Sequence, residues 1–355
     1  MQQRTSDYRI LMITPFHKNS RGNKLTSERL QTGLCRRGWN IELISLESAN
    51  WQEILYKNLR EERYSLIHGL NITHFTRVLS VFPDITHFPL LLTTTGTDVN
   101  YDLVLNREPA IAQTLNAVDY MVIFTDYFRT IFEELYPENL GKLVTIPQGV
   151  LLEKGDGPDR SQLGLHADDF VFLLPSGIRP VKNLELAIDA LEKLQPEFPH
   201  LRLLILGTII DKEYSDRILK RINALPWVIY PGEFPHRQMY SLLSMGDVVL
   251  NTSHAEGQPQ AALEAMSLGK PCLLTAVPGN INIIENGVEG YYVQNQDALA
   301  AAARKLMLNQ KLRRQMGENA RRLVEQKYSL EKELDAYEQL YRQLLQIDAD
   351  YADLP

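Results

Sequence analysis

The sequence predicts an α/β fold of two doubly wound parallel-sheet domains, and three observations support this prediction. Apolar runs of strand length alternate with amphipathic stretches along most of the 355-residue chain, which is typical of a parallel sheet covered by helices on both faces. The alternation stops over residues 147–169, which are rich in Gly, Pro and Asp, and then starts again. A chain of this length is also too long to fold around one small hydrophobic core, so two domains are expected.

Residues 1–150 are predicted to form the N-terminal domain. Its strand-like runs are YRILMIT, NIELISL, YSLIHG, FPLLLTTT and DYMVIF. Each run is short and nearly continuous in apolar residues, as expected for strands that are buried on both faces. The helical stretch LTSERLQTGLCRRG follows the first run and ends at Gly38, which suits a helix terminus because glycine adopts the left-handed conformation there readily.

Residues 151–168 are predicted to be an interdomain linker, and residues 169–327 to form the second domain. The strand-like runs of this domain are FVFLLPSG, LRLLILG, WVIYPG, DVVLNTS, PCLLTA and EGYYV, separated mostly by helical stretches such as NLELAIDALEKL and HRQMYSLLSMG. Residues 328–355 follow the last strand and begin with a long amphipathic stretch, so they are predicted to form a C-terminal helix.

Composition and charge exclude several classes of function. The net charge of −7 argues against a broad nucleic-acid-binding surface, and paired arginines such as Arg313-Arg314 and Arg321-Arg322 are interpreted as solvated helix faces. The two cysteines are far apart in apolar surroundings, which disfavours a disulfide framework or a zinc site and favours a reducing compartment. No apolar run approaches the roughly 20 residues of a membrane span, and no signal peptide is recognisable. A cytoplasmic location is therefore expected.

The stretch SHAEGQPQAALEAMSLGKP contains two glutamates, Glu256 and Glu264, eight positions apart after the strand-like run DVVLNTS. Pro259 suits the start of a helix, so Glu256 is expected in the loop above the helix and Glu264 about one turn inside it. Carboxylates so placed can accept hydrogen bonds from sugar hydroxyls, and the backbone N–H groups of Gly257 and Gln258 can face an anionic group. The alternative is that both carboxylates are ordinary charges near a helix N-terminus.

The stretch PSGIRPVKN carries Arg179 and Lys182 in a second loop that follows a strand-like run. Ligands of open parallel sheets bind outside the C-terminal ends of the strands, so both loops are expected beside a cleft that the two domains share. Two cations there can stabilise the charge that develops on a departing diphosphate. The alternative is an unrelated salt-bridge pair.

The loop after the first strand-like run contains Gly22 and Asn23, which are expected just before a helix with Thr26 or Ser27 near its cap. Backbone amides there can approach a phosphate, although an ordinary helix-cap turn explains the residues equally well. The chain contains no G-x-G-x-x-G sequence, which weakens the case for a dinucleotide-dependent dehydrogenase.

Three further polar residues of the N-terminal domain follow strand-like runs. His68 is the second-last residue of YSLIHG, and Thr97 and Asp98 lie in TTTGTDVN. His68 is a candidate catalytic residue because it can hydrogen-bond a hydroxyl of a ligand, but a buried structural histidine is the alternative. Asp98 can equally stabilise its own loop beside Gly96.

The chain resembles the family 4 retaining glycosyltransferases from about Arg9 to Tyr328, most strongly from Ser176 to Gly290. This family carries a Glu-x7-Glu pair in an EG-x-P…LEAM-x-x-G-x-P frame. Glu256, Gly257, Pro259, Leu263, Glu264, Ala265, Met266, Gly269 and Pro271 stand in register with that frame. The resemblance implies the GT-B fold, in which two Rossmann-like domains face a cleft and a C-terminal helix crosses back towards the N-terminal domain.

The resemblance also implies roles for individual residues. Glu256 would contact the hydroxyls of the donor sugar and Glu264 the ribose of the nucleotide. Arg179 and Lys182 would hold the donor diphosphate, although they are closer together here than is usual in the family. Relatives often have a Gly-Gly pair followed by Glu near the diphosphate, whereas this chain has VPGNIN, so that Gly279 and Asn280 are the candidates there. By the same resemblance, His68, Thr97 and Asp98 would line the acceptor side.

The function expected from these residues is transfer of a sugar from a nucleotide diphosphate sugar to a hydroxyl acceptor, with retention of configuration and without a cofactor or an essential metal. A nucleotide-sugar epimerase of the same fold and a non-catalytic nucleotide-sugar-binding protein remain as alternatives. The D-x-D string Asp348–Asp350 lies in an acidic tail and is interpreted as chance, and no H-E-x-x-H or G-x-S-x-G sequence occurs. Peripheral contact with a membrane, the acceptor and the oligomeric state are left open.

Overall fold

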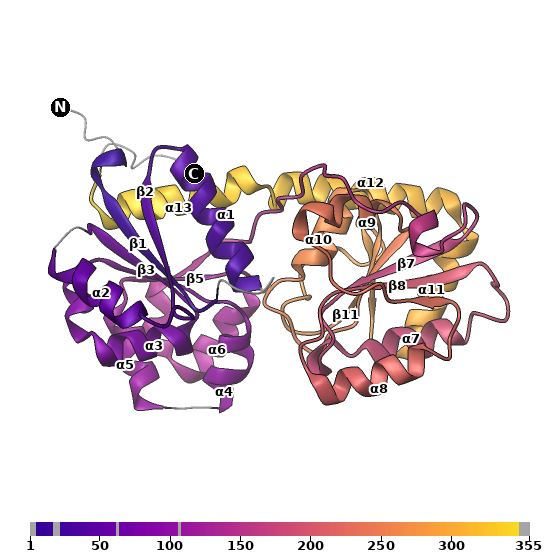
Figure 1. Cartoon of the computed structure of the whole chain (residues 1–355), viewed down its shortest axis with the longest axis horizontal. Helices are drawn as coiled ribbons and strands as arrows, with labels where there is room; N and C mark the ends of the chain where they lie inside the picture. Colours follow the sequence, from indigo (N-terminus) through magenta and orange to yellow (C-terminus); the bar gives the residue numbers. More distant parts are fainter. Residues whose placement is uncertain (1–4, 17–21, 62–63, 106–107, 348–355) are drawn as a thin grey trace. The chain divides into compact units, whose positions relative to one another are not determined.

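The computed structural model describes residues 5–16, 22–61, 64–105 and 108–347, and the chain forms two compact units. The first unit comprises Met1–Gly149 with Leu330–Pro355, and the second comprises Val150–Ser329 (Figure 1). Each unit is built around one six-stranded sheet in which every paired strand is parallel. The prediction of two doubly wound parallel sheets is confirmed.

The sheet of the first unit has the order β2-β1-β3-β4-β5-β6. Helices α1 and α13 cover one face, and α2, α3, α5 and α6 cover the other, with an apolar cluster between each layer and the sheet. The strands of this sheet are β1 (Arg9–Thr14), β2 (Asn40–Ser45), β3 (Leu66–Leu70), β4 (Leu90–Thr93), β5 (Tyr120–Ile123) and β6 (Leu143–Thr145). Its helices are α1 (Gly22–Arg36), α2 (Trp51–Arg60), α3 (Ile72–Val81), α4 (Leu103–Leu105), α5 (Pro109–Ala117), α6 (Tyr127–Leu135) and α13 (Leu330–Leu344).

Helix α13 is part of the first unit although the chain reaches it only after completing the second. Its Glu333 accepts two hydrogen bonds from Arg29 on α1, with Nε–Oε2 and Nη2–Oε1 distances of 2.7 and 2.8 Å, and both side chains are buried. Gly33 of α1 has no side chain, and a methyl group there would lie 2.6 Å from Leu334 of α13. The two helices therefore pack closely around a buried ion pair.

The sheet of the second unit has the order β12-β11-β10-β7-β8-β9. Helices α7, α8 and α11 cover one face, and α9, α10 and α12 cover the other. The strands of this sheet are β7 (Phe170–Pro175), β8 (Leu201–Leu206), β9 (Val228–Ile229), β10 (Val248–Asn251), β11 (Cys272–Thr275) and β12 (Gly290–Val293). Its helices are α7 (Leu184–Glu192), α8 (Lys212–Ile222), α9 (Met239–Ser244), α10 (Gln260–Ser267), α11 (Gln296–Leu308) and α12 (Gln310–Lys327).

Residues 151–168, predicted as a linker, lie within the second unit. Leu165 is buried in an apolar cluster of that unit, and the Arg160 guanidinium donates to the carbonyl oxygens of Met245 at 2.6 Å and Asp169 at 2.8 Å. This segment shows neither the helical nor the strand periodicity of apolar residues, and a few contacts attach it to the second unit. Its composition does not reveal these contacts.

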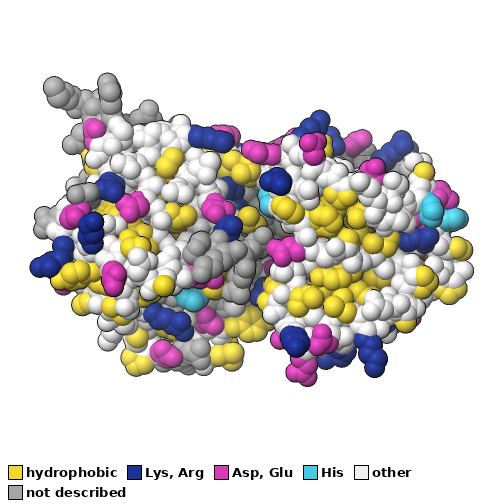
Figure 2. Space-filling model, in the orientation of Figure 1, with side chains coloured by type: hydrophobic (Ala, Val, Ile, Leu, Met, Phe, Trp, Pro, Cys, Tyr) yellow, Lys and Arg dark blue, Asp and Glu magenta, His cyan; other side chains and the backbone are white. Residues whose placement is uncertain are grey.

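The surface carries charges of both signs. On the face shown in Figure 2, acidic and basic side chains are interspersed over each unit rather than gathered into a field of one sign. This agrees with the moderate net charge of −7. Among the described residues, no helix combines the length and the apolar character that crossing a membrane requires.

Candidate functional site

The strand order of the second sheet places two of the predicted loops together. Strands β7 and β10 are neighbours, but the chain continues from β7 to β8 on one side and from β10 to β11 on the other. Such a switch in the direction of winding leaves a crevice outside the carboxyl ends of the two strands, where ligands of open parallel sheets bind. The loops that follow β7 and β10 carry Arg179, Lys182 and Glu256.

These two loops are joined by hydrogen bonds at several points. The backbone N–H of His254 donates to the carbonyl of Val181 at 2.8 Å, and the Thr252 hydroxyl donates to the carbonyl of Lys182 at 3.1 Å. The Lys182 ammonium lies 2.6 Å from Oε1 of Glu256. The structure therefore brings together a cation and a carboxylate that are 74 positions apart in the sequence.

Glu256 is buried and held by three donors to a single oxygen. Besides Lys182, the hydroxyl of Ser253 and the amide of Asn251 donate to Oε1 at 2.6 and 2.9 Å. Burial alone raises the pKa of the Glu256 carboxyl, but the Lys182 charge and the three hydrogen bonds outweigh it and hold this pKa below its usual value. Glu256 is consequently ionised at neutral pH.

Gly279 lies against the backbone of Glu256, and Asn280 bonds to a residue that holds the Glu256 carboxylate. Gly279 has a φ of 82°, and a methyl group there would lie 2.0 Å from the backbone oxygen of Glu256, so only glycine fits without displacing it. Asn280 is fully buried, and its amide nitrogen donates to Oδ1 of Asn251 at 3.1 Å and to the carbonyl of Thr275 at the same distance. Asn280 thus fixes Asn251, which in turn donates to Glu256.

Glu264 lies on α10, one turn after Pro259, which directly precedes the helix. Its side chain is 7% exposed, and its Oε1 lies 3.0 Å from Nε2 of His236. Gln258 is buried in the loop before the helix, and Gly257 is partly exposed there. Both glutamates of the Glu-x7-Glu pair are therefore nearly buried and bonded to basic side chains, rather than being freely solvated charges.

Arg179 precedes the short helical turn Pro180–Lys182 in extended conformation. Its Nε is buried, and within the described part of the chain no acceptor lies within hydrogen-bonding distance of it. A buried guanidinium nitrogen without an acceptor is unfavourable unless a ligand supplies one. The alternative of a salt-bridge pair therefore describes Lys182 in this structure but not Arg179.

His68, predicted as a candidate catalytic residue, lies in β3 of the first unit and is fully buried. Its Nδ1 lies 2.7 Å from the Tyr341 hydroxyl, and its Nε2 lies 2.7 Å from that of Thr93. Burial lowers the pKa of His68 to about 3, so the ring is neutral. With both ring nitrogens occupied, the side chain has a structural role here, which is the alternative interpretation of its sequence.

Asp98 also has structural contacts. It is fully buried and accepts hydrogen bonds from the backbone N–H groups of Ile72 at 2.8 Å, Thr95 at 2.9 Å and Val99 at 3.1 Å. Burial raises the pKa of Asp98, whereas these hydrogen bonds act in the opposite direction. The carboxylate therefore stabilises its own loop and the start of α3, while the neighbouring Thr97 is exposed.

Gly22 and Asn23 are the first two residues of α1, which begins earlier than the sequence predicts. Thr26 and Ser27 consequently lie about one turn inside the helix and are buried there, instead of capping it. The Ser27 hydroxyl donates to the backbone carbonyl of Lys24 at 3.0 Å, which satisfies it locally. Residues 17–21, which precede Gly22, lie outside the described residues, as does the D-x-D string at 348–350.

Three residues of the candidate site escaped the sequence analysis. Asn251 and Ser253 flank the end of β10 and donate to Glu256, and His236 contacts Glu264. Asn251 could have been found from the sequence, because it is a polar residue at the end of an otherwise apolar strand. His236 follows a different strand, and nothing in the sequence connects it with Glu264.

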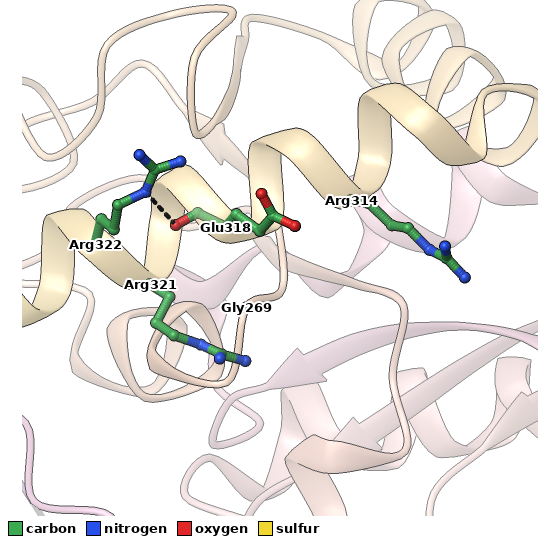
Figure 3. Close-up of a pocket in the computed structure, with 5 residues that line it drawn as sticks. All are labelled: Gly269, Arg314, Glu318, Arg321 and Arg322. Carbon is green, nitrogen blue, oxygen red and sulfur yellow. Dashed lines mark hydrogen bonds between the residues drawn. The ribbon is translucent and has the colours of Figure 1, made fainter.

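A surface hollow lies elsewhere, over α12. It has a volume of about 450 Å³ and is lined by Gly269 and by four α12 side chains, Arg314, Glu318, Arg321 and Arg322 (Figure 3). Arg322 bonds to the backbone oxygen of Glu318, and Arg321 bonds to that of Leu268, both at 3.4 Å. This is an open, mixed-charge helix face, as the paired arginines predicted.

One group of described side chains is close enough to share a metal ion, namely Asp168, Asp169 and His200. Asp169 already pairs with Arg202 at 3.0 Å and accepts from the backbone N–H of His166 at 2.8 Å. The group lies at the N-terminal ends of β7 and β8, whereas the candidate site lies beyond the C-terminal ends of β7 and β10.

Comparison with known proteins relates the second unit to a family. Residues 157–323 match the family model described as "Glycosyl transferases group 1". The Xenopus tropicalis "Glycosyltransferase 1 domain-containing protein 1" is 27% identical over 69% of this chain and 73% of its own length. An Escherichia coli protein, "UDP-Gal:alpha-D-GlcNAc-diphosphoundecaprenol alpha-1,3-galactosyltransferase", is 25% identical over 87% of this chain and 81% of its own.

Solved structures show the same fold. HepE from Anabaena in complex with UDP and glucose matches with a TM-score of 0.77 and 18% identity, over 95% of this chain and 100% of the other. Sucrose-phosphate synthase from Thermosynechococcus elongatus matches with a TM-score of 0.79 and 20% identity, over 96% and 100%. The family model covers the unit that holds Arg179, Lys182, Glu256 and Glu264. The chain therefore has the GT-B fold, and its second unit matches the group 1 glycosyltransferases.

Proposed function

We propose that this chain is a retaining glycosyltransferase that transfers a sugar from a nucleotide diphosphate sugar to a hydroxyl acceptor without an essential metal or cofactor. The observation that carries the proposal is the cluster at the carboxyl ends of β7 and β10, where Lys182 and Glu256 meet and the loop of Lys182 also carries Arg179 with its unpaired Nε. HepE has been solved in complex with UDP and glucose and in complex with UDP-glucose, which supports a nucleotide-sugar donor for this chain.

The diphosphate leaving group requires positively charged side chains beside it in the site. When the bond between the anomeric carbon and the diphosphate breaks, negative charge grows on the diphosphate oxygen. Arg179 and Lys182 are fixed cations that can stabilise that charge without reorganising. Arg179 can contact two oxygens in a planar fork, whereas Lys182 acts as a point charge. In this proposal they perform the task that a metal ion performs in other phosphate-leaving reactions.

Glu256 orients the sugar in this proposal. A carboxylate accepts about four hydrogen bonds, so Glu256 can accept from a sugar hydroxyl while Lys182, Ser253 and Asn251 hold it in place. Glu264 binds the ribose. Because Glu256 is ionised and tied to Lys182, it is assigned to holding the substrate rather than to proton transfer. The acceptor oxygen then bonds to the anomeric carbon from the face that the diphosphate leaves, and the acceptor proton passes to the departing diphosphate.

The proposal is tested by donor binding first. Wild-type protein is heated with UDP-glucose, GDP-mannose or ADP-glucose, since a ligand that binds only the folded state raises its thermal stability. Stabilisation by one of these donors is expected. The same donor is then incubated with simple sugar and lipid-linked hydroxyl acceptors, and NMR of the product reads its anomeric configuration. Transfer with inversion, or activity abolished by EDTA and restored by a divalent cation, would contradict the proposed mechanism.

Variants test the residue assignments. Lys182→Ala and Glu256→Ala should each lower kcat by about 100-fold to 1,000-fold, as removal of one transition-state-stabilising group does in other enzymes. Lys193→Ala is the matched control, because Lys193 also pairs with a carboxylate, Asp297, but on an exposed surface. Rates equal to that of the control would refute the assignments. Isomerised donor in the absence of acceptor would favour an epimerase, and donor binding without any turnover would favour a binding protein.

A further inference from the structure

His236 contacts the second carboxylate of the candidate site. It opens the short helical turn His236–Gln238 that leads into α9, and its Nε2 lies 3.0 Å from Oε1 of Glu264 on α10. A carboxylate can only accept hydrogen bonds, so Nε2 must carry the hydrogen and donate it. The imidazole therefore fixes one specific oxygen of Glu264.

The two side chains differ in exposure. The Glu264 side chain is 7% exposed and that of His236 is 32% exposed, so the carboxylate has lost most of its water while the imidazole reaches the surface. Within the ranges that the structure describes, Oε1 of Glu264 contacts His236, and no protein donor to Oε2 is found. Oε2 is not one of the buried atoms that lack a partner, so it is accessible to solvent. An accessible carboxylate oxygen without a protein donor can accept a hydrogen bond from a ligand hydroxyl.

We propose that His236 is a positioning residue that sets the affinity for the donor and its discrimination between ribose and deoxyribose. By holding Oε1, His236 keeps Oε2 of Glu264 oriented towards a ribose hydroxyl. This inference rests on the proposed function, in which Glu264 binds the ribose. The ribose is remote from the reacting carbon, so the contact strengthens ground state and transition state alike and acts on KM rather than on kcat.

The test uses the donor that most stabilises the wild-type protein among UDP-glucose, GDP-mannose and ADP-glucose. His236→Ala should raise KM by about 10-fold to 100-fold, the effect of one hydrogen bond to a charged group, and leave kcat unchanged. His236→Gln should restore most of the affinity, because its amide nitrogen replaces Nε2 as a donor. Wild-type protein should bind the ribonucleotide better than its 2′-deoxy or 3′-deoxy analogue, and His236→Ala should lose this preference.

His200→Ala is the matched control. His200 also faces a carboxylate, with 3.3 Å between its Nδ1 and Oδ2 of Asp168, but it directly precedes β8 at the opposite end of the sheet from the candidate loops. This variant should retain the wild-type KM and the ribose preference. In a double-mutant cycle, His236→Ala should change nothing further once Glu264→Gln has been introduced.

The outcomes separate this inference from the proposed function. If Glu264→Gln weakens donor binding while His236→Ala behaves like His200→Ala, His236 does not position Glu264 and the inference is overturned, although the proposed function stands. If His236→Ala lowers kcat and thermal stability without changing ribose preference, the residue is merely structural. If no nucleotide stabilises the wild-type protein and Glu264→Gln has no effect, both the inference and the proposed function fail.

Discussion

A single methyl group at Gly279 should disable the candidate site. In the structure this methyl would lie 2.0 Å from the backbone oxygen of Glu256, roughly 1.5 Å closer than the ~3.5 Å optimum for nonbonded heavy atoms. Relief of the overlap requires the Glu256 peptide to move by about 1 Å. A displacement of about 1 Å would stretch the 2.6 Å contacts of Glu256 with Lys182 and Ser253 beyond hydrogen-bonding range.

The expected magnitudes follow from this geometry. The left-handed φ of 82° costs a residue with a side chain about 1–2 kcal/mol, and overpacking adds about 1–3 kcal/mol, so the free energy of unfolding should fall by about 2–5 kcal/mol in Gly279→Ala. A displacement of about 1 Å in a group that orients substrate should lower kcat/KM by roughly 100-fold. Urea unfolding and steady-state nucleotide release measure the two quantities.

Gly287→Ala provides a control for backbone strain alone. Gly287 also has a left-handed φ, 92°, but the nearest atom to an added methyl is 3.9 Å away, on the Tyr291 ring. In this variant the free energy of unfolding should fall only by the cost of the left-handed φ, about 1–2 kcal/mol, and kcat/KM should equal that of the wild-type protein. The reasoning is refuted if Gly279→Ala and Gly287→Ala show the same rates, because the contact between Gly279 and Glu256 would then have no consequence for catalysis.

Two further predictions concern the first unit. His68 is neutral in the folded protein, with a pKa of about 3, but protonates near pH 6.5 when unfolded, so stability is present above pH 6.5 and is lost as the pH falls towards 3. From pH 7.5 to 4.5 the wild-type protein should lose about 2.5 kcal/mol more than His68→Gln in urea unfolding, and equal losses would contradict the buried neutral ring. Glu333→Gln leaves Arg29 without its buried counter-ion and should cost about 3–5 kcal/mol. Glu331→Gln, which removes an exposed partner of Arg37 from the same helix, should cost under about 1 kcal/mol, and a similar loss in both variants would disprove the difference.

Local patterns predicted every strand of both sheets except the three-residue β6, which is too short to stand out as an apolar run. Strands buried on both faces read as apolar runs, and β7, β8, β10 and β11 all lie within predicted runs because nothing but burial decides their composition. The Glu-x7-Glu frame likewise marks a loop and a helix start within one short stretch. What local patterns do not contain is the meeting of Lys182 with Glu256, which depends on the order of β7 and β10 in the sheet.

His68 shows why the remaining site residues were harder to predict. A polar residue at the end of a buried strand looks the same in the sequence whether it faces a ligand or a distant part of the chain. The hydrogen-bond partner of His68, Tyr341, is 273 positions away in the sequence, on a helix that returns to the first sheet. His236 presents the opposite case, because the role proposed for it acts through Glu264, which lies on another element. Both assignments require tertiary contacts that no periodicity encodes.

The return of α13 to the first unit has a consequence for how the protein is made. Residues 1–149 leave the ribosome first, but the face of their sheet beside α1 stays uncovered, and Arg29 stays without Glu333, until translation passes residue 344. The second unit is one continuous segment, Val150–Ser329, and all of its strands and helices are available earlier. The part of the chain that is synthesised first is therefore the part that completes its folding last.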